Sequence, residues 1–451
     1  MKPSLTCMLC LIVFVLQGSL ASVAQQQLSL RYAIDLALKQ NQEIALAHAD
    51  DGVAIADARS ARMTLLPKLS LTEDISRGND PVYAFGTRLR QQQFTQADFA
   101  LNALNRPQPI GNFSTRFSGS WVGFDSWKTQ REIRRADLLR ASSSFSTKAV
   151  DQQIVLQVVR AYQSVLYAQR QIDVAQHEQQ TAAALLASVE ERVQAGLVVE
   201  SDRMSAQVNV AARKEELIAA QGDLEMAWAE LRMAIGAAEL EPAELKPLES
   251  HVFPELPLEQ ALISAAKTRP DLQSLKQTRL AQTAAVGAAK SDFGPRVSAY
   301  GNWEQDRTSF AGAGGNNWLA GVQISIDILP AGKRAQLAHE SATQQRINAQ
   351  LALAQQHVRL EVSKANIQRR TAELSLETAQ AAIAQASESL RILNNRYRAG
   401  LATITDLLRA EDAERQSQSA YWRAVYGITL AYADQLYVTG MLTPEAAEEL
   451  Q

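Results

Sequence analysis

Cysteine is almost absent from this chain of 451 residues, since only Cys7 and Cys10 occur. Both lie within residues 1–24, which have the features of a secretory signal: Lys2 near the start, a short apolar stretch and small residues before the expected cleavage site. Cleavage would leave a chain with no cysteine. Disulfide bonds, thiolate metal sites and cysteine nucleophiles are then excluded.

Long apolar runs and long basic runs are absent as well. Beyond the signal no segment of 18 apolar residues occurs, so no helix is expected to cross a bilayer. Without Lys2 the 45 Lys and Arg residues become 44 against 48 Asp and Glu, a formal charge of −4. A nucleic-acid partner is therefore not expected. No cofactor motif, metal-ligand spacing or nucleophile–base pair stands out, so an enzyme is not expected either.

Proline and glycine are missing from two long stretches, residues 128–195 and 333–399. Apolar residues recur there at helical spacing, and a helix of this length measures about 100 Å. Helical patterns that long favour a coiled coil or a helical repeat over a globular helix. Gly196 and Gly400 follow the two stretches and suit the left-handed turn after a helix. Four shorter helices are predicted at 30–66, 202–235, 258–293 and 406–438.

The chain carries an internal tandem repeat. Residues 30–67 align without a gap on 258–295, and residues 192–236 align on 396–440. Two blocks in the same order indicate duplication of a larger unit. The predicted organisation is a signal peptide at 1–24, a first helix–hairpin–helix–helix repeat at 25–245, a second repeat at 246–440 and a short C-terminal tail at 441–451.

Four short segments alternate apolar and polar residues and are predicted to be strands. They are residues 69–75, 113–121, 297–303 and 318–327. Five aromatic residues in them are expected to face lipid or the membrane interface: Phe113, Phe117, Trp121, Trp303 and Trp318. Four strands are too few to close a barrel, so oligomerisation is expected. The sequence leaves dimer, trimer and tetramer open.

These features together resemble the outer membrane efflux proteins of the TolC family. The Ala-Gly-Leu turns in 192–202 and 396–406, each followed by an Asp, look like the family's paired helix tips. Phe124-Asp125 and residues 331–334 resemble its strand-to-helix junctions. Residues 81–98 resemble the longer first hairpin loop of one branch of the family.

The resemblance implies an α+β membrane protein. It would be a homotrimer with a 12-stranded β-barrel in the outer membrane and an antiparallel coiled-coil, α-helical tunnel in the periplasm. It also implies the passive exit duct of a tripartite efflux or type I secretion system, opened at its periplasmic tip. Its partners would be a periplasmic adaptor, an inner-membrane pump and outer-membrane lipid, with no cofactor. The alternative is a periplasmic coiled-coil scaffold or adaptor that does not span the membrane, which leaves the alternating strands unexplained.

The resemblance also suggests site residues. Asp202, Asp406 and Tyr397 match residues that hold the family's tunnel entrance shut, whereas Arg409 stands where the family has a second acidic residue. Arg409 could pair with Asp406 or with the partner subunit's Asp202. The simpler alternative is that both aspartates stabilise helix N-termini, with Thr403 completing a capping box. The expected adaptor contacts, which are also ordinary helix C-caps, are Ala195, Gly196, Leu197, Ala399, Gly400 and Leu401.

Overall fold

The computed structural model describes residues 27–247, 253–448 and 450, so the predicted signal peptide lies outside the described residues. The chain divides into two compact units. One falls within residues 1–46, 148–269 and 357–451, and the other comprises 47–147 and 270–356. Each unit therefore takes segments from both halves of the sequence, as expected when two copies of a repeat fold side by side.

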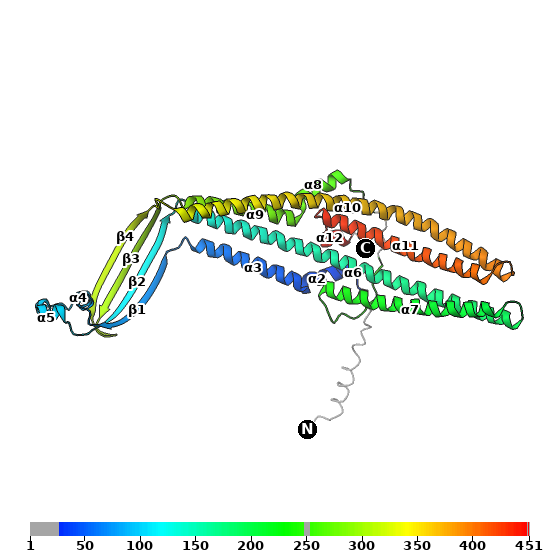
Figure 1. The fold of residues 1–451 in the computed structure, drawn as a ribbon, viewed down its shortest axis with the longest axis horizontal. Coiled ribbons are helices and arrows are strands. Elements are labelled where there is room, and N and C mark those ends of the chain that lie inside the picture. Colours follow the sequence, from blue (N-terminus) through cyan, green and yellow to red (C-terminus); the bar gives the residue numbers. More distant parts are fainter. Residues whose placement is uncertain (1–26, 248–252, 449, 451) are drawn as a thin grey trace, which may run out of the picture. The chain divides into compact units, whose positions relative to one another are not determined.

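The second unit contains one antiparallel sheet of four strands in the order β1-β2-β3-β4 (Figure 1). All four predicted strands are present; three extend beyond the predicted segment at both ends, whereas the fourth begins earlier and ends two residues before the predicted 327. Their bounds are β1 Lys68–Gly78, β2 Ile110–Phe124, β3 Arg296–Arg307 and β4 Gly314–Ser325. The hairpin from each repeat lies beside the other through the pairing of β2 with β3. Strands β1 and β4 form the two edges of the sheet.

The register separates an apolar face from a polar one. Leu71 lies opposite Phe117, Phe117 opposite Trp303, and Trp303 opposite Trp318, so one apolar row crosses all four strands. Phe113 and Trp121 share this face because they lie an even number of residues from Phe117. The opposite face carries Ser, Thr, Asn, Asp, Glu and Arg side chains. Such a sheet suits a boundary between apolar and aqueous surroundings.

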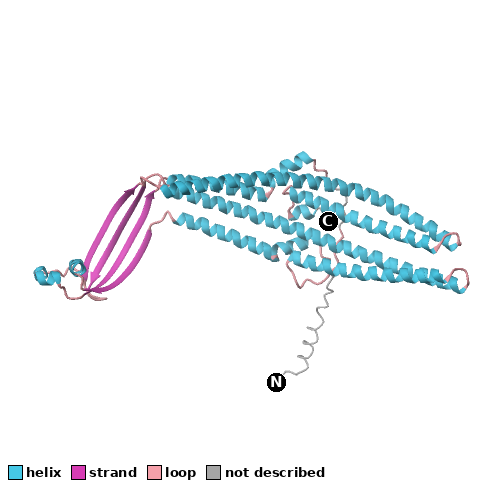
Figure 2. Ribbon diagram, in the orientation of Figure 1, coloured by secondary structure: helices cyan, strands magenta, loops and turns pink. Residues whose placement is uncertain are grey.

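Helices make up most of the remaining chain (Figure 2). The two stretches without proline or glycine are continuous helices of 67 and 68 residues, α6 Lys128–Gln194 and α10 Ala331–Arg398. Each is followed by a second helix, α7 Glu200–Ile235 or α11 Ile404–Val438. The shorter helices are α2 Leu30–Gln40, α3 Gln42–Met63, α4 Pro81–Arg90, α5 Leu101–Asn105, α8 Leu258–Thr268, α9 Pro270–Ser291 and α12 Pro444–Glu448.

The predictions of single helices at 30–66 and 258–293 are wrong in one respect, because each is broken. The breaks fall at Asn41 and Arg269, which occupy the same position in the two repeats. A Cβ on Gly236 would lie 2.8 Å from the Cα of Asn41, and one on Gly440 would lie 2.8 Å from the Cα of Arg269. The chain breaks where the C-terminal turn of α7 or α11 comes into backbone contact with it.

The first unit has a continuous hydrophobic core where the repeats meet. Leu30 and Ile34 from α2 pack with Tyr162 of α6 and Leu231 of α7, all buried. The Tyr162 hydroxyl lies within hydrogen-bond distance of the carbonyl oxygens of Leu28, at 2.7 Å, and Lys246, at 2.8 Å, which share its single hydrogen. The predicted C-terminal tail includes the helix α12, which contacts α2.

None of the helices in the described part of the chain combines the length and the hydrophobicity that a membrane span needs.

Candidate functional site

Both helical tips are closed by the same glycine turn, in agreement with the predicted C-caps. Gly196 and Gly400 have φ angles of +70° and +74°. In the first tip Leu197 N–H donates to the Arg192 carbonyl at 2.9 Å, and in the second Leu401 N–H donates to the Arg396 carbonyl at 2.8 Å. These long backward bonds are typical of the Schellman motif, which satisfies the last carbonyls of a helix. Local backbone chemistry therefore shapes the tips.

The side chains at the tips are apolar and exposed. Leu197 is 69% exposed and Leu401 is 68% exposed. In a Schellman motif the residue at this position usually packs back onto its own helix. Here both leucines project from the turn instead, and the first tip also exposes Val199, which is 63% exposed.

A small buried core joins the two hairpins beneath the tips. It includes Val189 of α6, Ala206 of α7, Tyr397 of α10 and Leu407 of α11. The Arg192 guanidinium lies 4.8 Å from the centroid of the Tyr397 ring and also donates to the Tyr397 carbonyl at 3.2 Å. Such a cation–π contact is worth about 0.5–2 kcal/mol, depending on burial. This contact ties the end of α6 to the end of α10.

Tyr397 is the most constrained of the predicted gate residues. Its side chain is buried, and among the described residues its hydroxyl has no hydrogen-bond partner. Burial raises the pKa of Tyr397, and the nearby negative charge of Asp202 raises it further, whereas Arg192 lowers it. Arg192 therefore contacts Tyr397, and the charge of Asp202 acts on the Tyr397 hydroxyl. The pairing of Tyr397 with Asp202 stays a prediction. The sequence reasoning missed Arg192 as their neighbour.

Asp406 has the simpler role that its spacing from Thr403 indicated. Its carboxylate accepts from the Thr403 hydroxyl at 2.7 Å and from the Thr403 N–H at 3.1 Å, and its own N–H donates to the Thr403 hydroxyl oxygen at 3.1 Å. These bonds lower the pKa of Asp406, with Arg409 and Arg396 adding smaller electrostatic effects. In the described part of the chain Arg409 forms no ion pair with Asp406. Within one subunit, Asp406 is thus a capping residue.

A cluster of charged side chains between the hairpins was not anticipated. Arg213 of α7 donates to Asp412 of α11 at 2.6 Å, and Arg415 of α11 lies 3.7 Å from Glu216 of α7. Arg213 is itself buried. The carboxyl groups beside these pairs are the buried Glu178 of α6 and Glu414 of α11 and the half-buried Glu411 of α11. Burial raises the pKa of Glu411 to about 7 and also raises that of Glu178.

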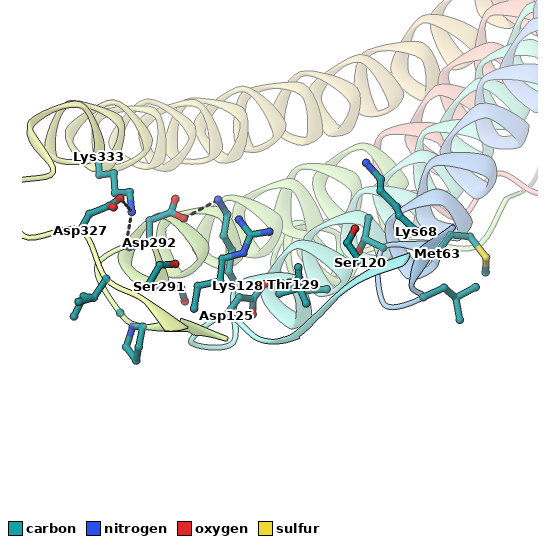
Figure 3. Close-up of a pocket in the computed structure, with 18 of the residues that line it drawn as sticks. Met63, Lys68, Ser120, Asp125, Lys128, Thr129, Ser291, Asp292, Asp327 and Lys333 are labelled. Carbon is teal, nitrogen blue, oxygen red and sulfur yellow. Dashed lines mark hydrogen bonds and ion pairs between the residues drawn. The ribbon is translucent and has the colours of Figure 1, made fainter. Parts of the chain in front are cut away.

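A cavity of about 970 Å³ lies where the strands pass into helices (Figure 3). Lys128 Nζ donates to Asp292 at 2.7 Å, and Lys333 Nζ donates to the Asp292 carbonyl at 2.7 Å and pairs with Asp327. Asp125 accepts from the N–H of Thr129 at 2.9 Å at the start of α6. These charged side chains pair with one another and with the backbone, and so hold the junctions between strands and helices in place. Among the described residues no group of three or more His, Cys, Asp or Glu side chains could hold a metal ion.

A sheet with one apolar and one polar face, joined to long helical hairpins, is typical of a membrane protein with a large helical part outside the bilayer. The chain belongs to the outer membrane efflux protein family, whose model matches residues 33–237 and 261–435. The two matched stretches follow the tandem repeat. The protein is accordingly an outer-membrane protein with a large periplasmic helical part.

Individual relatives are distant but similar over most of their length. Alkaline protease secretion protein AprF of Pseudomonas aeruginosa is 22% identical over 399 residues, covering 84% of this chain and 78% of AprF. Outer membrane protein TolC of Vibrio cholerae is 23% identical over 388 residues, covering 82% of each. The crystal structure of the CmeC outer membrane channel of Campylobacter jejuni has a TM-score of 0.78 at 18% identity, covering 91% of this chain and 85% of CmeC. The predicted family and fold class are confirmed.

Proposed function

We propose that this protein is the passive exit duct of a tripartite efflux or type I secretion system, opened at its periplasmic tip by an adaptor. The observation that carries the proposal is the combination of a two-faced sheet with two tips that each project one exposed leucine. The names of its relatives fit both branches, since AprF is a secretion protein and CmeC an outer membrane channel. Energy would come from the inner-membrane pump, because the duct itself moves cargo by diffusion.

Three copies of the chain would complete the structure. A bilayer tolerates no unpaired strand edge, so the edges β1 and β4 must pair with those of other copies. Three copies give a closed β-barrel of 12 strands, with the Phe117, Trp303 and Trp318 row toward lipid and the polar face toward water. Phe113 and Trp121 would lie on the same lipid-facing side. Mass measured in detergent distinguishes this trimer from a dimer, and a detergent-independent soluble monomer would favour the periplasmic scaffold.

The adaptor contacts would be the two tips. Exposed leucines on rigid turns bury apolar area with little loss of conformational freedom, which favours binding. Leu197 and Leu401 would supply that area, while Gly196 and Gly400 with their flanking Ala195 and Ala399 keep the backbone narrow enough to fit between partner helices.

The gate would lie just inside these tips. Tyr397, held by Arg192, is buried against the first hairpin, and its hydroxyl makes no hydrogen bond among the described residues. We infer that opening separates α6 from α10 and hydrates this hydroxyl. Asp202, Asp406 and Arg409 would form ion pairs with charged side chains of neighbouring copies, and these pairs would tune the opening.

Conductance of the purified protein in planar bilayers tests the proposal. Replacing Asp202 and Asp406 together with Ala should raise single-channel conductance, because two acidic side chains leave the narrowest part of the entrance. Asp223→Ala is the matched control, since Asp223 is exposed on the same helix as Asp202 but away from the tip. Unchanged conductance in the double variant removes both residues from the gate. Absence of any channel, even for the unaltered protein, rejects the duct.

A further inference from the structure

The connection between β1 and β2 is a small folded element. We call residues 79–109 the cap. Its aromatic side chains pack on one another, with ring centroids of Phe85 and Phe94 4.7 Å apart and those of Phe94 and Phe99 5.0 Å apart. An ion pair between Arg88 and Asp98 ties the helix α4 to the turn that follows. The cap thus holds its own shape through contacts that do not involve the sheet.

The cap is seated on the polar face of the sheet, at the strand ends away from the helices. Gln91 is 1% exposed, and its Nε2 lies 2.9 Å from Asn112 Oδ1 and from the Gly111 carbonyl oxygen, and 3.2 Å from the Arg307 carbonyl oxygen. Asn317 donates to the Arg90 carbonyl at 3.2 Å. These contacts reach β2, β3 and β4 from two adjacent residues of the chain, Arg90 and Gln91.

The contact between the cap and the sheet is made by polar groups, and the two backbones approach each other closely. A Cβ on Gly315 would lie 2.0 Å from the Arg90 carbonyl oxygen, so only glycine lets the cap approach β4 this closely. Gln91 Oε1 is buried without a partner among the described residues, and Gln92 holds a left-handed φ of 55°. Hydrogen bonds to water can replace those that would break, and the buried Gln91 Oε1 would gain a partner. Both effects reduce the free-energy cost of lifting the cap.

Seating also hides a charge. Asp306 of β3 is 0% exposed and accepts from Asn112 Nδ2 at 2.7 Å and from Asn317 Nδ2 at 3.3 Å. Both amides also contact the cap, Asn112 through Gln91 and Asn317 through Arg90. Lifting the cap would free these amides and expose the carboxylate on the polar face.

We propose that the cap is a second gate at the exit of the duct: seated through Gln91 on the polar face it narrows the pore, and lifted it widens the pore and exposes Asp306 as a cation-selecting residue. The proposal rests on the proposed function, since the polar face lines the pore only if the protein is a duct. It predicts two conductance levels that differ in ion selectivity.

Two substitutions release the cap by different physical routes. Gln91→Ala removes the seating hydrogen bonds, and Gly315→Ala places a methyl group where the Arg90 carbonyl now lies. Gly301→Ala is the matched control, because its added Cβ would meet nothing closer than 3.5 Å on the same sheet. Retention of the oligomer in detergent shows that each variant still assembles.

Single-channel recording in a gradient of KCl gives the readout. Both releasing variants should show about twofold higher conductance and a reversal potential shifted toward K⁺, while Gly301→Ala matches the unaltered protein. Adding Asp306→Asn to Gln91→Ala should keep the larger conductance but abolish the shift. If both releasing variants assemble into channels with unaltered conductance and selectivity, the proposal that the cap is a gate is rejected, whereas the proposed duct function still stands. Absence of channels from the unaltered protein rejects the duct itself.

Discussion

At the residue scale, the tip glycines are required by their backbone conformation and not by a lack of space. Nothing lies within 4 Å of a Cβ added at Gly196 or Gly400, so only their positive φ angles call for glycine. Gly196→Ala should therefore destabilise its tip by about 1 kcal/mol, from backbone strain alone. Hydrogen exchange of the tip amides measures this. Gly222→Ala, in the helical interior of α7 and equally uncrowded, should instead slow exchange around it; faster exchange there would contradict the argument.

The half-buried carboxyl group of Glu411 predicts a pH dependence. Because burial raises its pKa to about 7 in the folded protein, against about 4.3 in an unfolded chain, folding is favoured when it is protonated. This contribution is complete below about pH 4 and is lost as the pH rises to about 7. The apparent unfolding temperature should therefore fall between pH 5 and pH 8, and Glu411→Gln should flatten this dependence. An identical slope in the Gln variant would show that Glu411 is ionised throughout.

Other charged groups around Glu411 contribute to the same profile. Glu178, which also has a raised pKa, adds to the slope, while Arg213 opposes it. The further charged neighbours are His177, Glu216, Asp412, Glu414 and Arg415. Glu216→Gln is the matched control, because Glu216 is more exposed and already paired with Arg213.

The residue-scale predictions from sequence succeeded where the chemistry is local. The glycine turns and the Thr403–Asp406 capping box lie within a few residues, so spacing reveals them. Arg192 against Tyr397 and Arg213 with Asp412 join residues about 200 positions apart. No periodicity marks such pairs, because only the packing of one hairpin on another brings them together.

At the scale of elements, the helix breaks at Asn41 and Arg269 are matched by glycines that fit closely against them. Gly236→Ala should cost about 3 kcal/mol, since it combines a φ of +80° with a Cβ 2.8 Å from the Asn41 Cα. The apparent unfolding temperature of the assembled protein measures the effect. Gly427→Ala, within α11 and with open space around it, should raise that temperature slightly. Equal behaviour of the two variants would mean that the break does not depend on this contact.

The strands could be predicted from their alternation of apolar and polar residues. The long helices α6 and α10 could be predicted from the helical spacing of their apolar residues and from the lack of proline and glycine. The breaks could not, since neither Asn41 nor Arg269 is a strong helix breaker. The residue that follows Arg269 is proline, which gave one signal. The predicted repeat boundaries at 245 and 440 stay predictions.

At the scale of the whole molecule, the two faces of the sheet should respond oppositely to charge. Val322, 68% exposed on the apolar face, would meet lipid, so Val322→Arg should cost about 2–4 kcal/mol in the membrane. Gln323→Arg, one residue along on the polar face, should be tolerated. Recovery of the heat-modifiable oligomer from outer membranes compares them. Equal recovery would remove the assignment of the apolar face to lipid.

The two unpaired edges of the sheet also have a consequence in time. A newly exported chain carries open backbone donors and acceptors along β1 and β4 until other copies arrive, and open edges pair with whatever strand they meet first. Correct assembly thus competes kinetically with incorrect strand pairing. Because this competition depends on how fast subunits are supplied, the yield of assembled oligomer should depend on the rate of synthesis as well as on stability.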